Sequence, residues 1–177
     1  MASPEGPSFR IRKLEERDVR TTFRSGNVEL DRFFHRYAGQ NQFRHHIGTT
    51  YVAVREDGFI AGFATIAASE IVATALPAVA RKRLPQYPLP VLRLARLSVD
   101  ERANGAGVGS QLLRAVLALA ATMQGEFGCV GVVVDSKPDA VPFYTKLGFT
   151  ALEADAGQLG DRPEPLPMFL PLGSLAK

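Results

Sequence analysis

Apolar residues recur every three or four positions in three parts of the chain, and this spacing predicts helices. The first part, 17–42, reads as two helical pieces separated by a break near residues 25–27. The second, 110–123, has the most regular apolar face in the sequence. The third, 138–146, begins at a proline and ends before Gly148, and both are typical helix boundaries.

Runs of β-branched, aromatic or alternating residues predict strands in the remaining parts of the chain. Strands are expected at 8–14, 49–54, 59–66, 91–99, 130–134 and 168–172. The turn at 56–58 joins the second and third of these as a hairpin. Residues 71–83 are ambiguous, and 84–90 holds three prolines and reads as a loop. The order of elements predicts one mixed α/β (α+β) domain over 1–177 with a single central sheet.

Composition narrows the class of protein without changing this picture. The 177 residues suit one domain, and a hydrophobic fraction of 46% permits a sizeable core. The one cysteine, Cys129, fits a reducing compartment and lies in an apolar run typical of a buried thiol. Neither a signal peptide nor a run of about 20 apolar residues is present, so we expect a cytoplasmic protein that spans no membrane. No zinc-type Cys/His spacing occurs, and we expect no metal.

Charge is unevenly distributed along the chain. The overall net charge is only +3, but residues 1–102 hold 16 basic and 11 acidic side chains, against 5 and 7 in 103–177. The first part is therefore the better partner for a polyanion. An ordinary solvated surface explains the same count.

A glycine-rich turn separates the strand at 91–99 from the helix at 110–123. Its sequence from Arg102 is RANGAGVG. Glycines allow positive φ, and a helix N-terminus offers unpaired N–H groups and partial positive charge, which suits a phosphate. The turn predicts a pyrophosphate cradle, with a flexible turn and helix cap as the alternative. It lacks the Gly-Lys-Ser/Thr of a P-loop and the G-x-G-x-x-G spacing of a dinucleotide site.

The pattern R-x-x-G-x-G resembles the pyrophosphate turn of the GNAT superfamily of N-acetyltransferases. ARLSVDERANGAGVGSQLL is similar to the strand, turn and helix of that superfamily. VVVDSKPDAVPFYTKLGF is similar to the strand and helix that follow, including FY-x-x-x-GF at residues 143–149. The resemblance implies a mixed, mostly antiparallel sheet of six to seven strands, splayed where acetyl-CoA inserts between two of them.

The same resemblance implies residues that bind acetyl-CoA. The backbone N–H groups of the turn would hold the pyrophosphate: Asn104, Gly105, Ala106, Gly107, Val108 and Gly109. Arg102 would add a side-chain contact, or is a surface charge. The edge formed by Leu97, Ser98 and Val99 would pair with the pantetheine, and a backbone N–H there could stabilise the oxyanion.

Tyr144 is the candidate catalytic residue. Acetyl transfer expels the CoA thiolate, and a phenol with a reference pKa near 10 is a proton donor at neutral pH. The alternative is an aromatic residue that packs under the sheet. No general base stands out in the sequence, although Glu70 follows the strand where some GNAT enzymes carry a carboxylate.

The front half of the chain is similar to the TacT-type GNAT toxins. The matching segment starts at SGNVELD, continues to Asn41-Gln42 and reaches the strand TYV. This resemblance implies acetylation of the α-amine of aminoacyl-tRNA, and a ribbon-helix-helix antitoxin as partner. The α-amine suits the chemistry, because its reference pKa is near 8 and esterification should lower it further, so that much of it is already nucleophilic at neutral pH. Candidate tRNA contacts are Arg81, Lys82, Arg83, Arg93 and Arg96.

Two positions depart from the TacT-type pattern, and the identity of the acetyl acceptor stays undecided. Ala106 stands where many members have a cation, and Ser25 stands where cysteine is frequent. The alternatives to a tRNA-directed toxin are a GNAT enzyme that acetylates a small or protein amine, and a silent acyl-CoA-binding module. A homodimer is expected because many members of the superfamily dimerise.

Overall fold

The computed structural model describes residues 8–76, 78–152 and 165–174. Seven strands form one sheet in the order β1-β2-β3-β4-β5-β7-β6. Their bounds are β1 Arg10–Lys13, β2 Thr49–Val54, β3 Ile60–Ile71, β4 Leu89–Val99, β5 Gly131–Ser136, β6 Thr150–Ala151 and β7 Leu166–Pro171. Four of the described pairings are antiparallel and the β4–β5 pairing is parallel. The predicted mixed, mostly antiparallel sheet is confirmed.

Helices connect these strands. The α-helices are α1 Val28–Arg32, α2 Ala38–Gln40, α3 Ala78–Arg81, α4 Val108–Glu126 and α5 Val141–Lys146. The π-helical segments Phe33–Tyr37 and Asn41–His45 join α1 and α2 into one helical segment, 28–45. Short 3-10 turns occur at Ala73–Ala75, Glu101–Ala103, Pro138–Ala140 and Leu172–Ser174.

The chain forms two compact units. Unit 1 comprises Met1–Ala67 and Ala95–Ala118, and unit 2 comprises Ala68–Leu94 and Leu119–Lys177. The prediction of a single domain over 1–177 stays a prediction.

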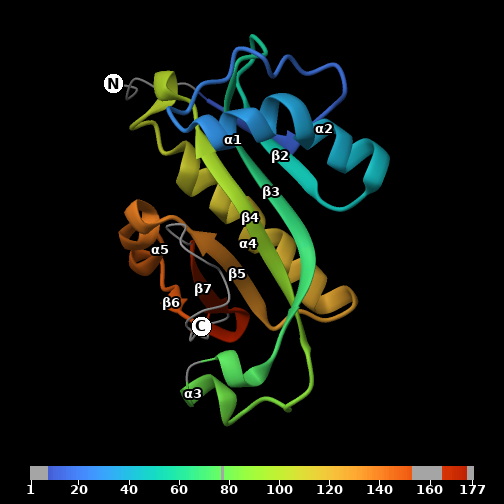
Figure 1. The fold of residues 1–177 in the computed structure, drawn as a ribbon, viewed down its shortest axis with the longest axis vertical. Helices are drawn as coiled ribbons and strands as arrows, with labels where there is room; N and C mark the ends of the chain where they lie inside the picture. The colour runs from blue at the N-terminus through green and yellow to red at the C-terminus, as the bar shows by residue number, and fades with distance from the viewer. Residues whose placement is uncertain (1–7, 77, 153–164, 175–177) are drawn as a thin grey trace, which may run out of the picture. The chain divides into compact units, whose positions relative to one another are not determined.

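The core of unit 1 is aromatic. The rings of Phe34 and Phe63 stack with centroids 4.5 Å apart, and Phe23 meets both edge-on. Phe63 thus faces the helical segment 28–45. The neighbouring Gly62 faces the other way, since a Cβ there would lie 2.8 Å from Val108 and 3.0 Å from Leu112. The helical segment 28–45 and the start of α4 therefore cover opposite faces of β3, as Figure 1 shows.

The core of unit 2 lies around β5 and β7. Val133 and Phe169 are buried opposite each other in the antiparallel ladder. The parallel ladder between β4 and β5 runs from Leu92↔Val132 to Leu94↔Val134. Apolar residues occupy both faces of β5, which explains the continuous VVV run.

One predicted helix is wrong. Residues 17–24 form turns instead of the first helical piece. The carboxylate of Asp18 accepts two 2.8 Å bonds from Arg12 on β1 and another from the backbone N–H of Glu15. Tertiary contacts thus override the helical spacing of this segment. The second helical piece is confirmed and extends to His45.

The other differences are changes of length. β3 runs five residues past the predicted end at 66, and β4 begins at Leu89, inside the predicted loop. The ambiguous stretch 71–83 ends β3 and then forms two short helical turns. The sequence did not predict β6, whose two residues pair with Met168 and Phe169 of β7.

Candidate functional site

The glycine turn lies in unit 1 between the end of β4 and the start of α4. Gly105 and Gly107 have φ of 81° and 76°, in the left-handed region that favours glycine. Apart from the glycine and its two chain neighbours, no described residue has an atom within 4 Å of the place where a Cβ would stand at either position. Conformation therefore requires these glycines, and the space beside them is open to a ligand.

The turn and the start of α4 leave backbone N–H groups available. Within the turn, Ala106 N–H donates to Ala103 O at 3.3 Å and Asn104 N–H to Glu101 O at 3.4 Å. The N–H groups of Gly105, Gly107, Val108 and Gly109 donate to none of the described residues. Four of the six predicted donors are thus free at the N-terminus of a 19-residue helix, where partial positive charge favours an anion.

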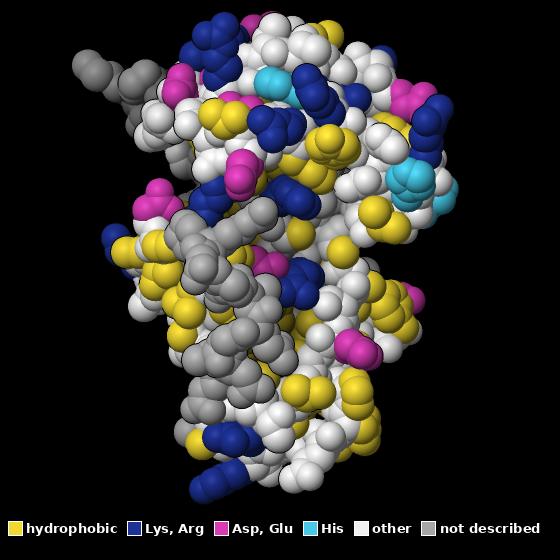
Figure 2. Space-filling view, in the orientation of Figure 1, with side chains coloured by type: hydrophobic (Ala, Val, Ile, Leu, Met, Phe, Trp, Pro, Cys, Tyr) yellow, Lys and Arg dark blue, Asp and Glu magenta, His cyan; other side chains and the backbone are white. Residues whose placement is uncertain are grey.

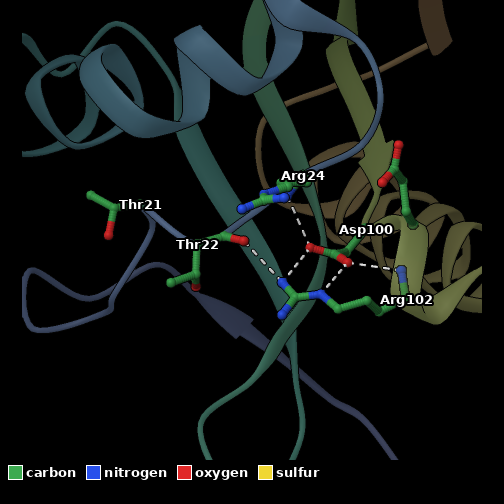
Figure 3. Close-up of a pocket in the computed structure, with 6 residues that line it drawn as sticks. Thr21, Thr22, Arg24, Asp100 and Arg102 are labelled. Carbon is green, nitrogen blue, oxygen red and sulfur yellow. Dashed lines mark hydrogen bonds and ion pairs between the residues drawn. The ribbon is translucent and has the colours of Figure 1, made fainter.

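The carboxylate of Asp100 holds the start of the turn in place. This residue is fully buried, and each of its carboxylate oxygens accepts two hydrogen bonds. Oδ1 accepts from the backbone N–H and Nε of Arg102, both at 2.9 Å. Oδ2 accepts from the backbone N–H of Arg24 at 3.0 Å and from Nη2 of Arg102 at 2.9 Å. We call Asp100 and these four donors the Asp100 clamp (Figure 3).

The clamp controls the charge of Asp100. Burial alone would raise the pKa of this carboxyl. The bonds from Arg102 and from the backbone N–H groups of Arg24 and Arg102 outweigh burial, and the pKa lies below its ordinary value. The carboxylate is therefore ionised at neutral pH and fixes the chain before α1 to the start of the turn.

Arg102 has a structural role in this clamp. Its Nη2 also donates to Thr22 O at 2.9 Å, and its guanidinium lies 4.7 Å from the centre of the Phe59 ring. Figure 3 shows the side chain folded back onto Asp100. The predicted contact of Arg102 with a pyrophosphate stays a prediction, although 56% of the side chain is exposed.

A cavity of about 420 Å³ adjoins the clamp. It is lined by Thr21, Thr22, Arg24, Asp100, Glu101 and Arg102. Of these residues, only Arg102 was predicted from the sequence. The one local signal was an acidic residue directly after a strand and two positions before an arginine, which could form a short-range pair.

Close packing fixes where α4 begins. A Cβ on Gly62 would lie 2.9 Å from Ser98 O, besides its contacts with Val108 and Leu112. Only glycine lets β3, β4 and α4 approach this closely. Ser98 is buried, whereas Leu97 and Val99 are partly exposed. Their predicted pairing with pantetheine stays a prediction.

Tyr144 lies on α5 in unit 2 and is 4% exposed. Its ring meets Phe143 and Phe149 edge-on, with centroids 5.1 and 5.4 Å away. Burial raises the pKa of its phenol above the ordinary value. Its hydroxyl makes no hydrogen bond to another described residue. The group is therefore a protonated phenol with a free hydroxyl.

The predicted RNA-contacting cations differ in their surroundings. Arg93 makes two 2.9 Å bonds to Asp135 on β5, which hold its guanidinium on the sheet. The guanidinium of Arg96 stacks on Phe33 at 3.8 Å. The other three, Arg81, Lys82 and Arg83, are exposed at the end of α3. Arg93 and Arg96 are thus engaged by other side chains, whereas Arg81, Lys82 and Arg83 are solvent-exposed.

A polar bridge in unit 1, which sequence patterns do not predict, is formed by Gln42. Gln42 donates to Leu14 O at 3.0 Å and accepts from the backbone N–H of Thr50 at 2.9 Å. It joins the helical segment to the first two strands. Asn27 caps α1 by accepting from Leu30 N–H, and Asp31 accepts from the hydroxyl of Ser25 at 2.6 Å. These contacts give structural roles to residues quoted only for their resemblance.

Two other features bear on the class of protein. Among the residues that the structure describes, no three His, Cys, Asp or Glu side chains gather as a metal site would need. No described helix is long and apolar enough to cross a bilayer. Glu70, the weak candidate for a general base, is exposed on β3.

Comparison with known proteins gives consistent matches. A family model of the acetyltransferase (GNAT) domain matches residues 19–160. A tRNA-acetylating toxin of Mycobacterium tuberculosis (strain ATCC 25618 / H37Rv) is 29% identical over 145 residues, which are 81% of this chain and 86% of that protein.

Solved structures share the fold. AtaT complexed with acetyl-methionyl-tRNAfMet has a TM-score of 0.84 and 22% identity, over 96% of this chain and 98% of that chain. A mutant AtaT toxin bound to the C-terminus of the antitoxin AtaR and acetyl-CoA has a TM-score of 0.76 and 21% identity, over 95% and 96% of the two chains. At this identity these two matches establish the fold alone.

Proposed function

Because the chain belongs to the GNAT acetyltransferase family, we propose that it transfers an acetyl group from acetyl-CoA to the α-amine of aminoacyl-tRNA. The acyl donor follows from the family and from the cradle described above. The acceptor is proposed from the similarity to the tRNA-acetylating toxin, which extends over most of both chains.

The observation that carries the proposal is the set of free N–H groups at the glycine turn. Gly105, Gly107, Val108 and Gly109 offer donors at a helix N-terminus, and positive φ at the first two leaves the space beside them open. This arrangement fits the pyrophosphate of acetyl-CoA. The cradle has no cation at Ala106, so backbone dipoles supply most of the attraction.

Bound acetyl-CoA supplies a thioester carbonyl that an amine can attack. In the proposed reaction the amine nitrogen bonds to the carbonyl carbon and the carbon–sulfur bond breaks. The Tyr144 hydroxyl donates its proton to the departing sulfur, and the proton lost by the amine returns to solvent or to the phenolate. The raised pKa of Tyr144 keeps the proton on the phenol until the sulfur takes up charge.

The acceptor requires little help from a general base. An α-amine has a reference pKa near 8, so an appreciable fraction is already nucleophilic at neutral pH. Glu70 is exposed on β3, and its surroundings do not single it out for this task. The chemistry therefore matches a site whose evident titratable group is an acid.

We also propose the biological setting implied by the relatives. Acetylation of aminoacyl-tRNA would block translation, and the chain would then act as the toxin of a toxin–antitoxin pair. Its partner would be a ribbon-helix-helix antitoxin, and the active form a cytoplasmic homodimer with one domain per chain. Expression without the antitoxin should arrest growth.

The test measures transfer of labelled acetyl from acetyl-CoA to total charged tRNA. Wild type should label charged tRNA but not deacylated tRNA. Tyr144→Phe should keep its fold and its affinity for acetyl-CoA and lose most turnover, because it removes only the hydroxyl. Phe143→Leu, which alters a neighbouring ring without touching the hydroxyl, serves as the packing control.

Two outcomes contradict the proposal separately. If charged tRNA carries no label while acetyl-CoA still binds, aminoacyl-tRNA is not the acceptor, and small amines and protein lysines are the remaining candidates. Near-wild-type turnover of Tyr144→Phe leaves the acceptor standing and removes Tyr144 from the mechanism.

A further inference from the structure

An exposed line of arginines runs along the helical segment 28–45. Arg32, Arg36 and Arg44 recur at multiples of four residues, with Gln40 between the second and third, and all four are exposed. We call Arg32, Arg36 and Arg44 the arginine stripe. We infer that the arginine stripe binds the phosphate backbone of the RNA substrate, an inference that rests on the proposed function.

The local helix geometry aligns these residues. In a regular α-helix, with about 3.6 residues per turn, each step of four residues rotates past a full turn by about 40°. Three such steps would place Arg44 about 120° around the helix from Arg32. The segments Phe33–Tyr37 and Asn41–His45 are π-helical, and their i→i+5 bonding widens the turn. A four-residue step then falls near one whole turn, and the three arginines share one face.

The opposite face of the helical segment is anchored in the core. Phe33, Phe34 and Ala38 are buried, and Leu30 and Phe43 pack against the same cluster. The burial of this face directs the arginine stripe to solvent. Figure 2 shows Lys and Arg side chains, together with His, over the part of the surface where Figure 1 places α1 and α2.

The arginines of the stripe have no carboxylate partner among the described residues, unlike several other arginines of the chain. By contrast, Arg12, Arg55, Arg93 and Arg102 each pair with an aspartate. Two acidic residues precede the stripe on the same helical segment. Asp31 accepts from the backbone and hydroxyl of Ser25, and Glu29 is exposed at the start of α1.

The chemistry of the stripe suits a row of phosphates. A guanidinium binds phosphate with two parallel hydrogen bonds and stays charged at any physiological pH. From Arg32 to Arg44 the stripe is roughly 15–18 Å long, at about 1.5 Å per residue or slightly less in the π-helical parts. That length matches several phosphates of one strand. Tyr37, exposed beside Arg36, offers a ring on which an unpaired base could stack.

The experiment compares variants in binding and in turnover. Affinity for fluorescently labelled charged tRNA is measured by anisotropy at several salt concentrations, and KM values are measured for charged tRNA and acetyl-CoA. The variants are Arg36→Gln and the triple variant Arg32→Gln, Arg36→Gln and Arg44→Gln. The control is Arg114→Gln, an exposed arginine of α4, the helix on the opposite face of β3.

Each arginine of the stripe should contribute about one unit to the slope of log K against log salt. We expect Arg36→Gln to lower that slope by about one unit and the triple variant by about two to three. KM for charged tRNA should rise in the same order, and KM for acetyl-CoA should stay unchanged. Arg114→Gln should match wild type.

The two levels of the proposal fail in different ways. A triple variant with the slope and KM of wild type, while wild type acetylates charged tRNA, overturns the arginine stripe and leaves the function intact. Wild type that neither binds nor acetylates charged tRNA overturns both. An equal effect of Arg114→Gln and Arg36→Gln indicates general electrostatic attraction and also overturns the stripe.

Discussion

Replacing Asp100 by asparagine tests whether the Asp100 clamp holds the glycine turn in place. Each oxygen of the carboxylate accepts one backbone N–H and one N–H of the Arg102 guanidinium. An asparagine keeps only one acceptor oxygen, whichever way its amide is turned. The other position becomes an NH₂ group that faces one backbone donor and one guanidinium donor.

The expected loss follows from these bonds. Leaving a buried donor without an acceptor costs about 1–3 kcal/mol, and a hydrogen bond to a charged group is stronger than a neutral one by about 1 kcal/mol. With one oxygen lost and the two remaining bonds no longer charge-assisted, Asp100→Asn should lower the free energy of unfolding by about 3–5 kcal/mol, similar to a broken buried ion pair.

Urea unfolding at neutral pH measures this change, and Asp57→Asn is the matched control. Asp57 also forms a two-bond pair with an arginine, Arg55, but on the exposed turn between β2 and β3. Its replacement should change stability little. A value for Asp100→Asn within 1 kcal/mol of wild type would refute the reasoning, because the turn would then keep its shape without the carboxylate.

The pH dependence provides a second check on the same clamp. The pKa of Asp100 is lower in the folded state than in the unfolded chain. Its contribution is therefore fully present above the unfolded pKa, near 3.9, and is lost as pH falls through the lower folded pKa. The asparagine variant has no such titration, so the stability difference between the two proteins should narrow below about pH 4. A difference that stays constant through this range would contradict the clamp.

Two glycine substitutions test the cradle and its support. Gly107→Ala should lower the free energy of unfolding by about 1–2 kcal/mol because of the positive φ, and should also weaken acetyl-CoA binding measured by calorimetry. The control Gly58→Ala, at a residue with φ of 89°, should show the loss of stability alone. If Gly107→Ala and wild type bind acetyl-CoA equally well, Gly107 is not part of the cradle. Gly62→Ala should lower the free energy of unfolding by about 1–3 kcal/mol in thermal unfolding, because its Cβ would lie 2.9 Å from Ser98 O. The control Gly125→Ala, on the open surface of a helix, should not lower stability. Equal melting temperatures of Gly62→Ala and wild type would contradict the packing argument.

Local patterns predicted the elements whose cause is local. The hairpin of β2 and β3 follows from alternating residues and the turn at 56–58, and its first strand was predicted with the observed bounds, Thr49–Val54. The apolar face of α4 was equally clear, and the left-handed φ of Gly148 agrees with the predicted end of α5. In each case, the side chains that set the pattern are also the ones that the core buries.

Long-range contacts decided the elements that sequence patterns missed. Residues 17–24 have helical spacing, but Arg24 N–H bonds to Asp100, 76 residues away, and Asp18 bonds to Arg12. No local pattern reports a pair at such separation. β6 is too short to show any periodicity, and its two residues form a strand only because β7 offers a free edge.

Some parts of the candidate site were likewise predicted from the sequence, and others became visible only in the folded chain. Spacing alone drew attention to the glycine turn, and resemblance to a family drew attention to Tyr144. The conformations that make the turn useful, positive φ at Gly105 and Gly107 with free N–H groups, needed coordinates. The function of Asp100 also depends on a loop distant in sequence, so only the folded chain shows that the turn has a support.

Charge counts identify a surface for a polyanion only after pairing is known. Arg93 and Arg96 were candidates because they lie in a basic part of the chain. In the structure Asp135 holds the first and Phe33 stacks with the second. The arginines without such contacts, Arg32 and Arg36 among them, lie on the polar side of an amphipathic helical segment. Because a carboxylate partner partly neutralises a paired guanidinium, these unpaired arginines attract the RNA backbone more strongly. The interaction partners of each arginine are therefore a better guide to the RNA-binding surface of the protein than its net charge.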